Sequence, residues 1–276
     1  EPFPGFASLW GGLARVNQAL RPFPQYAGVG IYGSTFGNSS YHSFQYKLDK
    51  RYSRGLTSTV AYTWSKFLTD AAMFDDNPAQ QDALQREKSY HPTDYPQVLT
   101  FSLQYSVPFK AENKAVNFLL GGWQIATVNT YSSGSRLFPT TSNPLPFFNL
   151  GLRPNIVDGS NIRSNISMSD YDPNNPAANT YLNRSAFANP APGQLSTAAR
   201  GLEVRGPGRL DESFALMKQN KIGERFTTQF RMEMQNPLNR VVFGNPIVDF
   251  TNAAFGRINS TQVGPRNIQL GLKLIF

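Results

Sequence analysis

The sequence predicts an all-β protein, an antiparallel meander of about eight long strands that is part of a transmembrane β-barrel with long extracellular loops. Three observations predict it: apolar and polar residues alternate, the alternating segments are long, and short and long connections take turns along the chain. The alternation is plainest in the last segment, "NIQLGLKLIF", where an apolar residue takes every second place from Ile268 to Phe276. A period of two is typical of a β-strand with two unlike faces.

The same alternation recurs earlier in the chain. It is found in "SFQYKLDKRY" (43–52), "TSTVAYTWSK" (57–66), "VLTFSLQYSVPF" (98–109) and "ERFTTQFRMEMQ" (224–235). We expect strands near residues 26–35, 42–53, 56–68, 97–109, 121–136, 210–220, 224–236 and 265–276.

The predicted connections favour a membrane barrel. Tight turns at 53–55 and 220–224 and a moderate connection at 110–122 alternate with long polar segments, which are 69–97, 137–210 and 236–265. Bacterial outer-membrane barrels have short periplasmic turns and long outer loops. A structureless connection as long as 137–210 would be unusual inside a compact soluble domain.

Strands with two unlike faces also fit a soluble sandwich, in which the apolar faces point into a core. In a membrane barrel the apolar faces meet lipid and the polar faces line the lumen. Segments near the ~9–11 residues that cross a bilayer favour the barrel, because strands of soluble sheets have a usual length of ~5–6 residues. We therefore expect the charged residues of the polar faces in the lumen: Lys47, Asp49, Arg51, Arg225, Arg231, Glu233 and Lys273.

Composition narrows the class further. The chain of 276 residues has no cysteine, which excludes disulfides and thiolate metal sites and fits an oxidising compartment. The net charge of +8 is spread along the chain, so we expect no nucleic-acid binding. No stretch approaches the ~20 apolar residues of a membrane-spanning helix.

The chain divides into two parts. Residues 1–24 are expected to be a short helical or irregular lead-in, because Leu9, Leu13, Val16 and Leu20 follow a helical spacing that ends before Pro22. Residues 25–276 are the predicted barrel segment.

Aromatic residues recur beside the predicted short connections. If the C-terminus lies in the periplasm, alternating strand directions place five of them at one inner rim: Tyr52, Phe109, Trp123, Phe226 and Phe276. Aromatic rings favour the membrane interface, where an apolar body and a polar edge are both accommodated. We therefore predict that these five side chains form a periplasmic aromatic girdle.

The candidate polar sites have simpler explanations. His42 begins a strand and His91 lies in a loop, and we expect both to be solvated. Ser43 forms no triad with His42, because neighbouring strand residues face opposite ways, so we expect no enzyme activity. The acidic loop 69–96 could bind Ca²⁺, although its spacing matches no EF-hand and a solvated loop is the better interpretation. Its carboxylates are Asp70, Asp75, Asp76, Asp82, Glu87 and Asp94.

Two further motifs lie in the long connections. Phe147 and Phe148 could stack on a ligand, or form a small core that folds their loop over the barrel mouth. The stretch "RGPG" (205–208) is expected to be a turn that leads into the strand at 210, since it lacks the Lys-Ser/Thr pair and the helix of a phosphate loop.

Six segments in order resemble the C-terminal barrel segment of TonB-dependent receptors, most closely the Oar-like branch. They are "ALRPFPQYAGV" (19–29), "SSYHSFQYKLDKRYSRGLTSTVAYTWSK" (39–66), "DYPQVLTFSLQYSVPF" (94–109), "LLGGWQIATVNTYSSGSRL" (119–137), "RGPGRLDESFALMKQNKIGERFTTQFRMEMQNPLN" (205–239) and "FGRINSTQVGPRNIQLGLKLIF" (255–276). The end of the chain likewise resembles the assembly signal of outer-membrane barrels, with Leu272, Leu274 and the terminal Phe276.

The resemblance implies uptake of a bulky solute through a barrel of about 22 strands with an N-terminal plug. It implies outer-membrane lipid, the barrel-assembly machinery and, if a plug lies upstream, the TonB complex as partners, and it implies no cofactor. About eight strands cannot make that barrel, so we expect the C-terminal third of a receptor or a truncated relative, with two unpaired sheet edges. A non-transporting surface protein (an adhesin or a scaffold for envelope assembly or secretion) and a soluble β-rich binding module are the alternatives.

Overall fold

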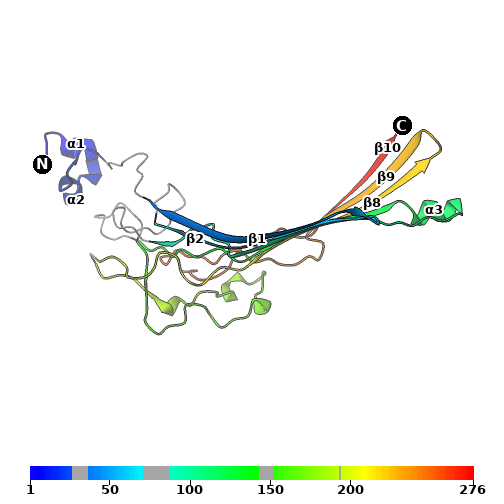
Figure 1. The fold of residues 1–276 in the computed structure, drawn as a ribbon. Coiled ribbons are helices and arrows are strands. Elements are labelled where there is room, and N and C mark those ends of the chain that lie inside the picture. The colour runs from blue at the N-terminus through cyan, green and yellow to red at the C-terminus, as the bar shows by residue number, and fades with distance from the viewer. Residues whose placement is uncertain (27–36, 71–87, 143–151, 193) are drawn as a thin grey trace.

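One curved antiparallel sheet runs through the molecule in the computed structural model, which describes residues 1–26, 37–70, 88–142, 152–192 and 194–276 (Figure 1). Its long strands lie in the order β1 (Ser39–Ser53), β2 (Leu56–Thr69), β4 (Gln97–Ser106), β5 (Trp123–Ser132), β8 (Arg209–Ile222), β9 (Phe226–Gln235) and β10 (Asn267–Ile275). The short β3 (Ser89–Tyr90) pairs with the end of β2. The all-β meander is confirmed. The strand expected at 26–35 lies, apart from Tyr26, outside the described residues.

The strand register gathers the apolar residues on one face, called here the apolar face. Tyr46 pairs with Tyr62 and Tyr62 with Leu99, while across the sheet Leu216 pairs with Met232 and Met232 with Leu270. Directly paired residues of an antiparallel sheet point to the same side. The apolar face includes Phe44, Tyr46, Leu48, Val60, Tyr62, Trp64, Leu99, Phe101, Leu103, Ile125, Leu216, Phe230, Met232, Leu270 and Leu272.

The opposite side, called here the polar face, carries most of the charges predicted to lie together. By the same alternation it holds Lys47, Asp49, Arg231, Glu233 and Lys273. Arg225 precedes β9, and Arg51 lies within a register shift between Lys50 and Ser53, so the pairing assigns neither of them.

No second layer in the described part of the chain turns the sheet into a sandwich. Leu272 is 80% exposed, and neither Phe230 nor Met232 belongs to a buried core. The one other sheet in the described part of the chain pairs two-residue strands, β6 (Asn155–Ile156) with β7 (Phe187–Ala188). The apolar face is therefore uncovered over most of its area, as expected of a surface that meets lipid.

Among the described strands, β1 and β10 form the two edges of the sheet. No pairing among the described residues joins β1 to β10, and β10 is exposed along its whole length. This is the open, curved piece of sheet that the strand count predicts.

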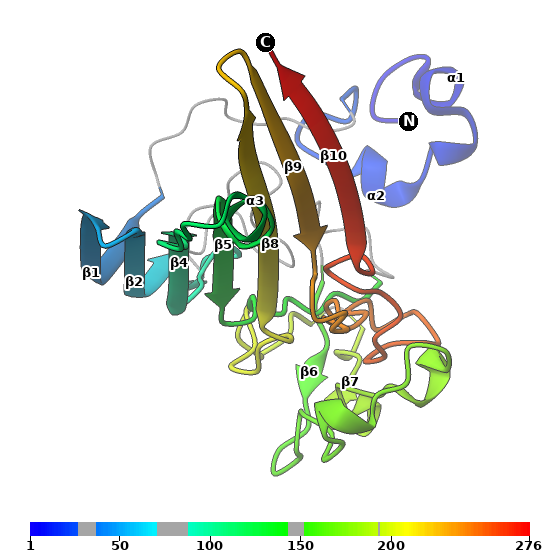
Figure 2. The ribbon, with the colours of Figure 1, turned by 90° about the vertical axis from the view of Figure 1, so that its right-hand side faces the viewer.

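Short connections lie at one end of the strands and long ones at the other, as predicted. Figure 2 shows the β8–β9 hairpin above and β6 and β7 below. In the β1–β2 turn Gly55 has a φ of +81°, and a Cβ there would lie 2.3 Å from the carbonyl oxygen of Ser106, so the turn requires glycine. The β4–β5 connection contains the unpredicted helix α3 (Lys114–Leu120), and the side chain of Asn113 caps its first turn.

The long connections are more than loops. Parts of 137–205 and 236–265 fold together around a hydrophobic core, and we call this unit the loop module. Its core contains Leu137, Tyr171, Tyr181, Leu182, Ala186, Phe187, Leu202, Phe243, Phe255 and Ile258. Its short 3-10 helices are η2 (Met168–Asp170), η3 (Pro176–Ala178) and η4 (Arg184–Ala186). The long connections were predicted, but this core was not, because the apolar residues that form it follow no period along the sequence.

The lead-in is helical but broken. It forms α1 (Phe6–Trp10), η1 (Gly11–Leu13) and α2 (Val16–Ala19), and Gly11 at a φ of +50° interrupts the first helix. No helix in the described part of the chain is long and apolar enough to cross a membrane.

Candidate functional site

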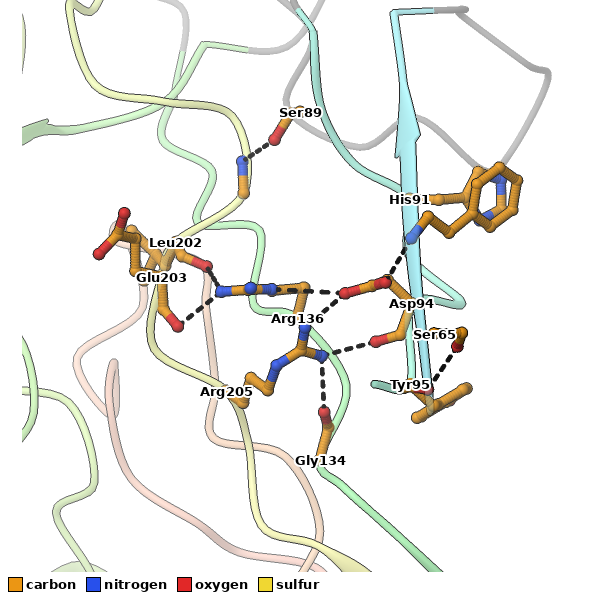
Figure 3. A network of polar contacts seen from close by, with 12 residues as sticks. Ser65, Ser89, His91, Asp94, Tyr95, Gly134, Arg136, Leu202, Glu203 and Arg205 are labelled. Atoms are coloured by element: carbon orange, nitrogen blue, oxygen red, sulfur yellow. Dashed lines mark hydrogen bonds and ion pairs between the residues drawn. The ribbon is translucent and has the colours of Figure 1, made fainter. Parts of the chain in front are cut away.

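A buried ionic contact ties the sheet to the loop module (Figure 3). Asp94 lies just before β4, and its side chain is only 1% exposed. One carboxylate oxygen accepts a hydrogen bond from the backbone N–H of Phe67 at 2.7 Å. The other oxygen accepts from Arg205 Nη2 and lies 3.8 Å from Arg136 Nε. A single carboxylate thus holds β2 and both ends of the segment between β5 and β8.

The two arginines also bind backbone carbonyls. Arg136 Nη1 donates to the oxygens of Leu202 and Glu203, and Arg205 Nη1 donates to those of Asp94 and Gly134. Burial, and then the neighbouring charge of Arg205, lower the pKa of Arg136. Charge-assisted hydrogen bonds of this kind are among the strongest polar contacts in proteins. The cluster therefore fixes the position of the loop module on the strands.

The cluster corrects the interpretation of the acidic loop. Asp94 is a buried ion-pair partner and not a solvated carboxylate, because Arg205 and Arg136 close over it. Asp70 accepts a hydrogen bond from the backbone N–H of Asn38. The other four carboxylates of this loop, Asp75, Asp76, Asp82 and Glu87, lie outside the described residues, as do Phe147 and Phe148. Among the residues that are described, no three acidic or histidine side chains gather as a metal site.

The expectation for His91 was also wrong. Its ring is buried and stacks on Phe67, with the ring centroids 4.2 Å apart. The cause is the backbone, since His91 N donates to Phe67 O at 3.0 Å as β3 joins the edge of β2. His42, in contrast, is exposed as expected and pairs with Lys66.

A cleft of about 480 Å³ opens beside the ion cluster, at the end of the apolar face. Trp64, Lys66 and Tyr90 line it together with the two arginines. The guanidinium carbon of Arg136 lies 3.5 Å from the centroid of the Tyr90 ring. The sequence could not predict the cleft, because its cationic side chains come from distant segments. Lys66 lies on β2, whereas Arg136 and Arg205 lie near the two ends of the connection between β5 and β8.

The five aromatic residues of the predicted girdle all lie toward the end with the short connections. Trp123 begins β5 and Phe226 begins β9, Phe276 follows β10, and Phe109 lies just beyond β4. Tyr52 falls in the register shift at the end of β1, which breaks the alternation on which its outward direction depended. The girdle as a band around a barrel stays a prediction.

Trp123 has a defined local role. Its indole Nε1 donates to the carbonyl oxygen of Leu119 at 3.1 Å, and Lys218 Nζ lies 4.5 Å from the centroid of its ring. Lys218 Nζ also donates to the oxygens of Leu119 and Gly121. These contacts hold the end of α3 against β5 and β8.

The comparison with protein families agrees with this architecture. The chain matches the family described as "Outer membrane beta barrel domain" over residues 7–269. No curated protein and no solved structure matches the chain. With a match that spans nearly every residue, an uncovered apolar face and long antiparallel strands, the chain belongs to the outer-membrane β-barrel domain family and is a protein of the bacterial outer membrane.

Proposed function

We propose that this chain is the C-terminal barrel segment of a TonB-dependent receptor, in which it helps to import a bulky solute. The open sheet carries the proposal. Its two edge strands find no partner in each other among the described residues, so closure needs strands additional to those of the sheet. A barrel closed by about eight strands is filled by side chains, whereas larger barrels enclose a lumen.

The two faces of the sheet support the same function. The polar face, with Lys47, Asp49, Arg231, Glu233 and Lys273, suits the wall of a wet passage. The apolar face suits outer-membrane lipid. The open C-terminal strand with Leu272, Leu274 and Phe276 suits recognition by the barrel-assembly machinery, and we propose the TonB complex as a partner through an upstream plug.

The loop module supports a role in recognition. It lies at the end opposite the short turns, and the Asp94 ion cluster fixes it to the strands. Rigidly positioned loops at the mouth of a scaffold commonly carry binding function. We propose a transport role without catalysis, cofactor or nucleic-acid partner.

Cysteine labelling in intact membranes tests the orientation of the strands. Lys47→Cys and Glu233→Cys should react with a charged, membrane-impermeant maleimide, and Leu272→Cys should react only with a lipid-soluble one. The reverse pattern would place the charges outside and would reject the lumen assignment.

Solute depletion from the growth medium tests import. A strain that lacks the gene and a strain that lacks TonB should leave the same solute unconsumed, while the parent consumes it. If both strains consume every solute like the parent but the gene deletion impairs surface adhesion or envelope integrity, the non-transporting surface protein is the right assignment.

A further inference from the structure

The cleft beside the ion cluster is continuous with the apolar face. Its floor is made by cross-strand pairs of β1 and β2, first Phe44 with Trp64 and then His42 with Lys66. Tyr90, paired with Leu68, extends the same side at the edge of β2. The cleft therefore has an aromatic side, which belongs to the apolar face, and a charged side with Lys66, Arg136 and Arg205.

The described residues that line the cleft carry an excess of positive charge. Among the residues that line it, Lys66, Arg136 and Arg205 face a single carboxylate, that of Asp94. Asp94 is engaged by both arginines, so the described lining residues offer no further carboxylate to Lys66. Lys66 is exposed, and the contact shown for its ammonium in the described structure is with the Tyr90 ring, 5.6 Å from the centroid.

We infer that this cleft binds the phosphate-bearing headgroup of an anionic membrane lipid. Lys66 is placed to meet the phosphate, with Arg136 and Arg205 supplying the field behind it, and Trp64 and Phe44 flank the start of the acyl chains. Lysine is a common phosphate ligand, and basic pockets between the helices of helical membrane proteins bind lipid headgroups in the same way.

The chemistry of the walls selects a lipid over a free anion. Phosphate in solution gains nothing from Trp64 and Phe44, both of which are exposed on the apolar face. A lipid uses both walls at once, because its charged and apolar parts meet at the depth where the cleft changes from aromatic to cationic. The inference rests on the apolar face meeting lipid and not on solute import, so a failed uptake experiment leaves it standing.

Native mass spectrometry of the full chain in a neutral detergent tests the inference. Phosphatidylglycerol should remain bound, and phosphatidylcholine with the same acyl chains should bind much more weakly. Lys66→Gln should weaken phosphatidylglycerol binding about fivefold, the effect of one lysine at a charged lipid surface. Lys66→Arg should retain it.

Lys47→Gln is the matched control, since Lys47 lies on the neighbouring strand but on the polar face. It should leave binding unchanged. Equal binding of the two lipids, or equal effects of Lys66→Gln and Lys47→Gln, would overturn the inference. Full displacement of phosphatidylglycerol by millimolar inorganic phosphate would also overturn it, because the site would then be one for a free anion.

Discussion

Asp94→Asn should release part of the loop module from the sheet. The substitution keeps the volume of the side chain, and Asn Oδ1 can still accept the hydrogen bond from Phe67 N. It removes the negative charge between Arg205, whose side chain is 19% exposed, and Arg136, which is 9% exposed. Two largely buried guanidinium groups are then left without their counter-charge.

The size of the effect follows from that burial. Removal of one partner from a buried ion pair destabilises a protein by about 3–5 kcal/mol, and the retained hydrogen bond argues for the lower end. About 3 kcal/mol corresponds to a change on the order of a hundredfold in the equilibrium between the docked and the released module.

Hydrogen exchange of the full chain, followed by mass spectrometry, measures this change. The amide of Leu202 donates to Leu137 O at 2.9 Å and that of Gly201 to Ser89 Oγ at 3.0 Å, and both bonds join the end of the module to its surroundings. Their exchange should accelerate by on the order of a hundredfold in Asp94→Asn. The amides in the middle of the sheet should keep their rates.

Asp211→Asn is the matched control, because it removes the carboxylate of an exposed ion pair. The side chains of Arg209 and Asp211 are 54% and 52% exposed, so their contact contributes about 0–1 kcal/mol. If Asp94→Asn accelerates exchange no more than Asp211→Asn does, the ion cluster does not hold the module on the sheet.

Three further predictions concern other parts of the chain. Phe276→Ala should lower the amount of protein in the outer membrane several-fold, whereas Ile275→Ala, on the polar face, should not. Immunoblots of membrane fractions compare the two variants, and equal amounts of both would reject the assembly signal. Gly256→Ala should destabilise the loop module by about 2 kcal/mol or more, since Gly256 has a φ of +81° and a Cβ would lie 2.3 Å from Leu182 O; unchanged protease resistance of the module would contradict this. Burial raises the pKa of Tyr181, so the stability that its neutral hydroxyl contributes is complete below the pKa of the unfolded chain, near 10, and is lost as the pH rises through the folded pKa. The module should therefore become protease-sensitive in that alkaline range, and Tyr181→Phe should reduce this sensitivity to pH. An unchanged sensitivity in Tyr181→Phe would count against the role of Tyr181.

The sequence by itself determined the strands and their faces. Successive side chains of a strand point to opposite sides, so the pattern in "FQYKLD" or "IQLGLK" shows which residues share a face without knowledge of the neighbours. The alternation also restricts how neighbouring strands pair, because a slip by one residue would turn Tyr46 or Leu270 to the polar face. The alternation of short and long connections then placed the turns at one end.

Only the tertiary structure decided what the long connections do. Asp94 and Arg205 are separated by 111 residues, and neither belongs to a periodic pattern that could bring them together. The buried position of His91 follows from a backbone bond to Phe67, and the register shift at Tyr52 interrupts an otherwise regular alternation. A repeating pattern reports the direction of a side chain within its own element, whereas the loop module, the ion cluster and the cleft depend on contacts between segments whose meeting is fixed only when the whole chain packs.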